Sequence, residues 1–243
     1  MLKTLNKWIF YAALVTLIPA FMYKDSFPDP EERQYGSLAA PLQSHASKPG
    51  FQTVYAEVNY SIEPRYDYEL TGLVVSQAVH NAKYGLHRRW NDHLNVADLC
   101  VVWGDNAGSL DLNAFEFRNG QFTCNISTGS SQAWRAFKMN ELSNNHLLSD
   151  DETIREQIQD VRIGDRIHLQ GWLSRYGNDQ GFSRDTSTTR EDSGNGACET
   201  IFVNRFEIID SMHNSWRGAW SVSLFAAVSS ALIWLVAVGR GRW

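Results

Sequence analysis

The 243-residue chain carries 22 Lys plus Arg against 27 Asp plus Glu, for a formal net charge of −5. All acidic residues lie between residues 24 and 215, whereas five basic residues lie outside that range. The central segment is therefore acidic and has no basic stripe, which argues against a nucleic-acid-binding protein. The sequence has no phosphate-binding loop, no G-x-G-x-x-G and no G-x-S-x-G motif, so we expect no cofactor.

Two apolar stretches without charged residues stand near the chain ends, Trp8–Tyr23 and Trp220–Val238. The second spans 19 residues, close to the roughly 20 that an α-helix needs to cross a hydrocarbon core, and the first spans 16. Both predict transmembrane helices. Two alternatives stay open. The first stretch also fits a cleaved signal peptide, and the second a buried core helix.

Basic residues at both tails predict the orientation. Lys3 and Lys7 precede the first stretch, and Arg240 and Arg242 follow the second. The positive-inside rule then places both termini in the cytoplasm of a bacterium and the central segment in the periplasm, across the inner (plasma) membrane. The expected segments are a signal-anchor or transmembrane helix over 1–23, a linker over 24–50, a periplasmic β-rich domain over 51–215, and a transmembrane helix with a short basic cytoplasmic tail over 216–243.

Residues 24–50 are rich in Pro, Ser and charged residues without an apolar period, which is typical of a linker. From Phe51 on, β-branched and aromatic residues alternate with polar ones, as in strands. Asn119-Gly120 matches the two-residue type I′ turn of a hairpin. The expected β segments are 51–62 (ending before Pro64), 66–79, 97–104, 114–126, 161–176 and 199–210.

One helix is expected after Ser149, which would cap it in a capping box with Glu152. Ile154, Ile158 and Val161 follow at helical spacing, and the pattern predicts that Ile154 and Ile158 pack against the sheet. Eight further side chains are expected in the core because they lie on alternating or continuously apolar runs: Val74, Leu99, Val101, Phe117, Ile167, Leu169, Ile201 and Val203.

Two phrases, VRIGDRIHLQGWL at 161–173 and ETIFVNRFEII at 199–209, resemble the later strands of an OB-like or other small Greek-key barrel. The resemblance implies a mainly β fold with one or two helices, a small antiparallel barrel between two transmembrane helices. The phrases WNDHLNVADLCVVWG, LSNNHLL and GNGACETIFV are similar to membrane-anchored bacterial proteins to which no activity is attached. That second resemblance implies topology only.

Three cysteines lie in the central segment: Cys100, Cys124 and Cys198. An oxidising compartment permits one disulfide, and we favour Cys100–Cys124 of the three pairings because both residues lie in neighbouring β segments. Cys198 would then be a buried thiol or, with a nearby His, a nucleophile. No metal site is expected, because the histidines lack H-x-H or H-x-x-x-H spacing.

Aromatic and polar residues cluster at four places: Trp90–Asp92, Trp103–Asn106, Ser143–His146 and Ser193–Gly196. Exposed Trp and Asn together suit recognition of a glycan or of another protein. The alternative is that the tryptophans fill the core and the polar residues form turns. The candidate binding residues are Trp90, Asp92, Trp103, Asp105, Asn106, Asn144 and His146.

The sequence thus favours a non-catalytic, membrane-tethered extracytoplasmic module of the bacterial envelope, with another envelope membrane protein as its partner. The competing hypothesis is an envelope enzyme that acts on a cell-wall or lipid-linked substrate. Acid–base chemistry would then come from residues among Asp92, Asp98, Asp105, His93 and His146.

Overall fold

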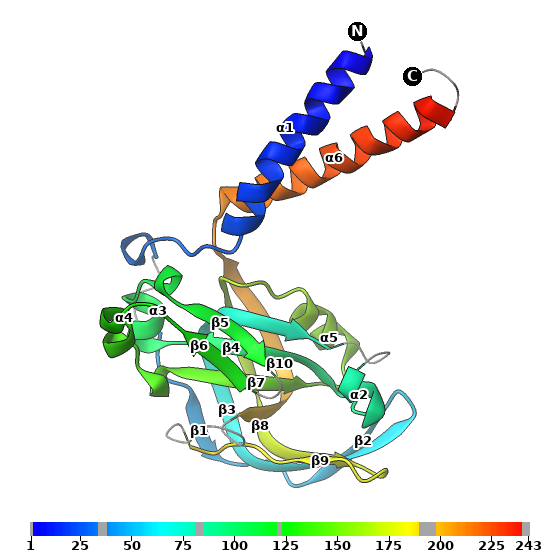
Figure 1. Cartoon of the computed structure of the whole chain (residues 1–243). Coiled ribbons are helices and arrows are strands. Elements are labelled where there is room, and N and C mark those ends of the chain that lie inside the picture. Colours follow the sequence, from blue (N-terminus) through cyan, green and yellow to red (C-terminus); the bar gives the residue numbers. More distant parts are fainter. Residues whose placement is uncertain (1, 34–37, 81–84, 121–122, 190–197, 240–243) are drawn as a thin grey trace. The chain divides into compact units, whose positions relative to one another are not determined.

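The structure is a computed structural model, and it describes residues 2–33, 38–80, 85–120, 123–189 and 198–239 (Figure 1). The chain forms two compact units. One unit contains residues 1–28 and 213–243, and the other is Asp29–Met212. The Ser193–Gly196 cluster and the two arginines of the C-terminal tail, Arg240 and Arg242, lie outside the described residues.

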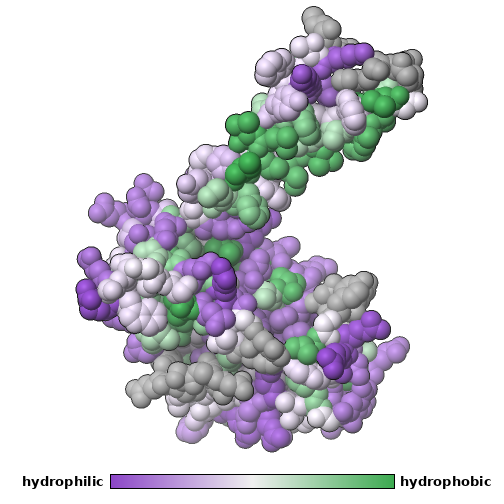
Figure 2. All heavy atoms as spheres, viewed as in Figure 1, coloured by the Kyte–Doolittle hydropathy of each residue, from purple (hydrophilic) through white to green (hydrophobic). Residues whose placement is uncertain are grey.

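The terminal unit consists of two helices, α1 (Leu2–Tyr23) and α6 (Ser215–Gly239), both long and apolar enough to cross a membrane. Hydrophobic residues cover much of their surface in Figure 2. Small side chains are buried where the two helices contact each other. Such side chains let the helix backbones approach closely, which favours packing in a bilayer, where the hydrophobic effect does not drive helices together. These residues are Ala13 and Ala20 of α1 and Ser223, Ala227 and Ser230 of α6.

The central unit is mainly β, as expected. Eight strands form one sheet: β1 (Leu42–His45), β2 (Phe51–Tyr55), β3 (Val58–Val79), β4 (Asn95–Val102), β7 (Leu142–Leu148), β8 (Asp165–Asn178), β9 (Ser183–Arg184) and β10 (Glu199–Ser211). A separate hairpin contains β5 (Glu116–Gly120) and β6 (Thr123–Ser127). The helices of this unit are α2 (Gly85–Arg89), α3 (Gly104–Gly108), α4 (Ser131–Ala136) and α5 (Glu152–Gln159), with short 3₁₀ turns at Pro30–Glu32, Leu112–Ala114 and Met139–Glu141.

The strand pairings close on themselves. β3 pairs with β4, β4 with β7, β7 with β10, β10 with β8, and β8 again with β3. Four of these pairings are antiparallel, and β7–β10 is parallel. β1 and β2 pair with β3, and β9 pairs with β8, outside this cycle.

Seven of the eight expected core residues are fully buried on the strands, with relative exposures of 0–1%. The exception is Phe117, which is only half-buried because it lies on β5, outside the main sheet. Its neighbour Phe115 is buried instead. In β8, buried and partly exposed residues alternate from Asp165 to Trp172, so the expected period of two is confirmed.

The expected helix is α5, and it contacts β4 and β10. Ile158 is buried, whereas Ile154 is only half-buried. The cap differs from the prediction: Asp151, not Ser149, accepts hydrogen bonds from the first-turn amides, because its carboxylate reaches two of them. The expectation of one or two helices besides the transmembrane pair is too low, since the described part of the central unit has four α-helices. Three of those in the central unit, α2 to α4, are too short to show an apolar period.

Pro64 does not end a strand. β3 continues through it, with a register shift against β8 between Pro64 and Tyr66 that accommodates a residue unable to donate to the ladder. The chain turns earlier, at Ala56-Glu57, where both residues have positive φ (48° and 65°). A type I′ hairpin turn requires positive φ at both of its central residues. The sequence did not predict this turn, because Ala-Glu contains neither the Asn nor the Gly that usually occupies those positions.

Asn119-Gly120 is not the hairpin turn that the sequence suggested. Both residues lie in β5, and Gly120 pairs with Thr123, which places the two-residue connection at 121–122, outside the described residues. Asn119 is kept in the strand because its backbone amide donates to Ser76 Oγ at 3.1 Å.

Much of the expected linker is folded. β1 pairs with β3, and Leu38 forms a bridge with Gly104. Arg33 is buried, and its guanidinium donates to the carbonyls of Ala107 and Leu110. Residues from Asp29 onward therefore belong to the compact central unit.

Candidate functional site

A buried acid on β4 forms the centre of a polar network. Asp98 Oδ1 lies 2.5 Å from His146 Nδ1 and 2.8 Å from His80 Nε2. Burial alone would raise the pKa of Asp98, but its hydrogen bonds with His146 and His80 outweigh burial and hold that pKa below the ordinary value. For His146, burial lowers the pKa, and the neighbouring carboxylate opposes that shift. The arrangement favours an ionised Asp98 beside a neutral imidazole.

The network continues through two imidazoles that are in contact at a tilt. The rings of His80 and His87 have centroids 3.9 Å apart, and His87 Nδ1 lies 2.9 Å from Asp92 Oδ2. Tyr176 donates its hydroxyl to the Asp92 carboxylate at 3.0 Å, and burial next to this acid raises the pKa of Tyr176 well above the ordinary value. We call the six residues the polar network: Asp92, Asp98, His80, His87, His146 and Tyr176.

Only one part of the polar network reaches solvent. Asp92, Asp98 and His146 are 0–4% exposed, whereas the side chains of His80 and His87 are 14% and 13% exposed. Across the described ranges, no three or more His, Cys, Asp or Glu side chains are arranged to hold a metal ion. His80 and His87 are therefore the members of the polar network that solvent reaches.

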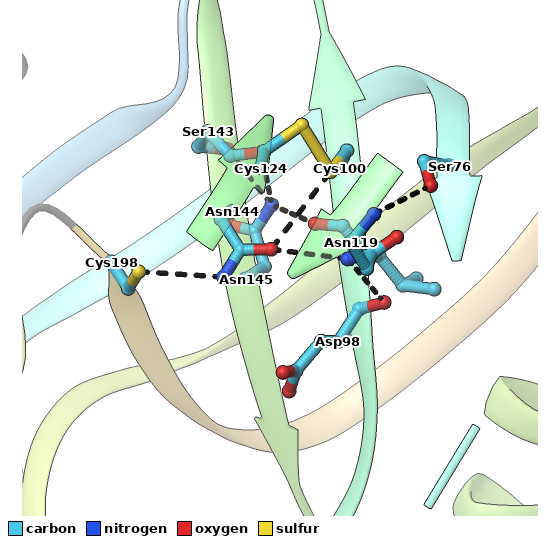
Figure 3. Close-up of a disulfide and its surroundings, with 10 residues drawn as sticks. Ser76, Asp98, Cys100, Asn119, Cys124, Ser143, Asn144, Asn145 and Cys198 are labelled. Atoms are coloured by element: carbon cyan, nitrogen blue, oxygen red, sulfur yellow. Dashed lines mark hydrogen bonds between the residues drawn. A yellow bond between two sulfur atoms is a disulfide. The ribbon is translucent and has the colours of Figure 1, made fainter. Parts of the chain in front are cut away.

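A second polar group lies on the same face of β4 and β7, and Cys198 joins it from the position just before β10 (Figure 3). Asn144 donates to Cys198 Sγ at 3.3 Å and accepts from Asn119 Nδ2 at 3.2 Å. The expected Cys100–Cys124 disulfide is confirmed, and it joins β4 to β6. The β5–β6 hairpin is thus fixed to the sheet by one covalent bond and by Asn119.

Cys198 is buried and is not part of the Cys100–Cys124 disulfide. Burial raises the pKa of its thiol, and the hydrogen bond from Asn144 only partly offsets that effect. A thiolate, not a thiol, is the nucleophile in cysteine chemistry. The structure therefore favours the buried-thiol interpretation of Cys198.

Two loops meet at one end of the sheet. The Trp90 ring, from the connection between β3 and β4, stacks on Phe182, from the connection between β8 and β10, with centroids 5.5 Å apart. Asn178 Nδ2 donates to the Trp90 carbonyl at 2.8 Å. Tyr60 donates to the Asn91 carbonyl at 2.6 Å, and burial raises the pKa of Tyr60 to about 12. These contacts fix the first loop against the second loop and against β3 and β8.

A groove with a volume of about 490 Å³ opens beside this junction. It runs along β3 and β8, and Tyr176 links its wall to the polar network. The other lining side chains are mostly amides, hydroxyls and aromatics, with three charged residues. They include Gln52, Asn59, Tyr60, Ser61, Glu63, Arg175, Asn178, Asp179, Phe182 and Ser183.

The seven candidate binding residues do not form one exposed surface. Five are buried: Asp92, Trp103, Asn106, Asn144 and His146. Trp90 is half-buried in the loop stack, and Asp105 is exposed in an ion pair with Lys138. The burial of Trp103 matches the alternative that tryptophan fills the core. The LSNNHLL segment forms the central strand β7, which pairs with β4 and β10 and whose polar side chains are buried.

The residues of the enzyme hypothesis converge only in part. Asp98 and His146 are in contact, and Asp92 is connected to them through His80 and His87. The other two members, Asp105 and His93, are not members of the polar network. His80, His87 and Tyr176 were not predicted, because their spacing along the chain shows no motif and only the folded sheet brings them together.

Comparison of the chain with protein-family models, with curated proteins and with solved structures found no match.

Proposed function

We propose that this chain is a membrane-tethered, non-catalytic binding module whose central unit is an OB-type barrel. An OB fold is a five-stranded, partly open Greek-key barrel whose ligand lies between the loops that follow its first and fourth strands. The cyclic pairing of β3, β4, β7, β8 and β10 supports this architecture. The loops that follow β3 and β8 are the two that meet at the Trp90–Phe182 stack.

The groove next to that stack is the observation that carries the binding role. Its lining offers hydrogen-bond donors and acceptors together with aromatic faces, and its few charges have both signs. Such a surface suits a polar, extended segment of another protein better than a polyanion, because an acidic chain repels nucleic acid. The proposed ligand is a periplasmic segment of another envelope membrane protein.

The two terminal helices support the same role. A domain that is anchored at both ends stays close to the bilayer, and its orientation is restricted. This restriction favours lateral binding to a second membrane protein, because tethering raises the effective concentration of each binding surface near the other. We place the central unit in the periplasm and both termini in the cytoplasm, on the strength of Lys3 and Lys7.

Site-specific crosslinking in living cells tests the proposal. A photo-crosslinking residue at Ser61, in the groove, should give a discrete adduct with one membrane protein. The matched control is Glu207, an exposed residue of β10 that does not line the groove. Adding Arg175→Glu in the groove should weaken the Ser61 adduct. Equal adducts at both positions, or an adduct insensitive to Arg175→Glu, would contradict the groove as the contact site.

The envelope-enzyme hypothesis remains as the second candidate, because Asp98, His146 and Cys198 occupy the same sheet region. Their burial and the raised pKa of the thiol argue against it. Replacing Cys198 with Ala and His146 with Gln, one at a time, separates the two functions. If either single variant loses all function while its level in the membrane stays normal, the enzyme hypothesis is favoured. A binding module should retain function in at least the Cys198 variant.

A further inference from the structure

The two-helix unit contains a crevice that the central unit does not share. It has a volume of about 820 Å³ and lies between the N-terminal half of α1 and the C-terminal half of α6. Its wall has two chemically different parts. Lys3, Lys7 and Asn6 are polar, whereas Phe10 and Leu235 are apolar.

The polar part is fixed on one face of α1. Lys3 and Lys7 are four residues apart, so their side chains project from the same side of the helix. Asn6 Nδ2 donates to the Ser230 carbonyl at 3.1 Å, which holds α1 against α6 beside the two lysines. Neither α1 nor α6 contains an acidic residue.

The apolar part lies deeper along the helices. Phe10 and Leu235 face the crevice, and Trp234 is half-exposed beside them. Inside a bilayer a space between two helices is filled by lipid, because water has no polar partners there. An acyl chain would cover these apolar side chains, while the headgroup of the same molecule would reach the lysines.

We propose that the α1–α6 crevice binds one anionic phospholipid, with its phosphate on Lys3 and Lys7 and an acyl chain along Phe10 and Leu235. Basic pockets between transmembrane helices are suited to acidic lipid headgroups. A zwitterionic lipid fits less well, because its own cation would approach two ammonium groups. The inference rests on the membrane location given under the proposed function, and it does not depend on the groove of the central unit.

Native mass spectrometry of the full chain in detergent tests the proposal, with palmitoyl-oleoyl phosphatidylglycerol and palmitoyl-oleoyl phosphatidylcholine as probes. We expect one phosphatidylglycerol to bind in preference to phosphatidylcholine. The double variant Lys3→Gln/Lys7→Gln should bind phosphatidylglycerol about thirty-fold more weakly, as the loss of two juxtamembrane lysines implies. Lys24→Gln, beyond the other end of α1, is the matched control and should bind normally.

A second variant tests the apolar part without changing charge. Ala231→Trp fills the crevice and should also reduce phosphatidylglycerol binding, while circular dichroism checks that the helices persist. Equal binding of both lipids, full binding by the double lysine variant, or displacement of the lipid by inorganic phosphate would overturn the proposal. If lipid binding is lost while the Ser61 adduct persists, the lipid site and the groove are separate functions.

Discussion

Asp98 on β4 and His146 on β7 are direct cross-strand neighbours, and their Oδ1 and Nδ1 atoms lie 2.5 Å apart in the interior of the central unit. A buried carboxylate is tolerated only when polar partners satisfy it, and here His146 forms a hydrogen bond with Asp98 while His80 Nε2 lies 2.8 Å away. The pair therefore connects the stability of the sheet to the protonation of two side chains.

Acid should destabilise the protein in two steps. The pKa of His146 is lowered from about 6.5, so the folded state resists protonation and stability declines as the pH falls below about 6.5. The pKa of Asp98 is lowered from about 3.9, so its contribution is present above about pH 4 and is lost as the pH falls towards the folded-state value. Denaturant unfolding of the full chain in detergent at pH 7, 5 and 3 measures both steps.

Two variants assign the first step. His146→Gln should flatten the change in unfolding free energy between pH 7 and pH 5, because the buried titrating group is gone. His45→Gln, at an exposed position on β1, should leave the wild-type slope. If His146→Gln also keeps the wild-type slope, then the pair does not control acid stability.

Ile167→Ala should lower the free energy of unfolding by about 2–5 kcal/mol, because Ile167 is 0% exposed and its removal leaves a cavity. Ile209 offers a matched control on β10, where it is 39% exposed. Ile209→Ala should cost less than about 0.5 kcal/mol. Urea titrations of both variants give the comparison, and similar losses would show that Ile167 is not a core residue.

Gly171→Ala should destabilise the sheet, because a Cβ at this position would lie 2.2 Å from the Phe202 carbonyl oxygen of the paired strand. Backbone atoms cannot move aside as a flexible side chain can, so β8 and β10 must separate locally. We expect a loss of roughly 1–3 kcal/mol. Gly129→Ala, where nothing lies within 4 Å, should have little effect on the melting temperature. Equal melting temperatures for the two variants would contradict the close approach.

The Cys100–Cys124 bond should contribute roughly 3 kcal/mol through the chain entropy of the unfolded state, since it closes a loop of sequence separation 24. Cys124→Ser should therefore unfold at lower denaturant concentration and become insensitive to reductant. Cys198→Ala should keep the reductant sensitivity of the wild type. Peptide mapping without reduction should find Cys198 outside any bridge, and a bridge that contains it would refute the assignment.

Sequence reasoning succeeded where a local pattern decides the structure. The alternation in β8 and the helical spacing in α5 each follow from the period of a single element. It failed at β7, whose Asn144 and His146 were expected on a binding surface, because their buried hydrogen bonds are made with β4, with the β5–β6 hairpin and with Cys198. It also failed at Ala56-Glu57, where strand pairing imposes positive φ on residues that do not favour it. The polar network could not be found for the same reason, since His80, Asp98 and Tyr176 become neighbours only through the sheet.

The orientation of the two helices gives a final prediction. α1 and α6 can each span a bilayer, and Lys3 and Lys7 favour a cytoplasmic N-terminus. An even number of spans then returns the C-terminus to the cytoplasm. A reporter that is active only in the periplasm should be active when fused after Gly120 and inactive when fused after Trp243. Because the first fusion contains only α1, activity there also shows that α1 alone exports the residues C-terminal to it. Inactivity after Gly120 together with activity after Trp243 would reverse the proposed orientation.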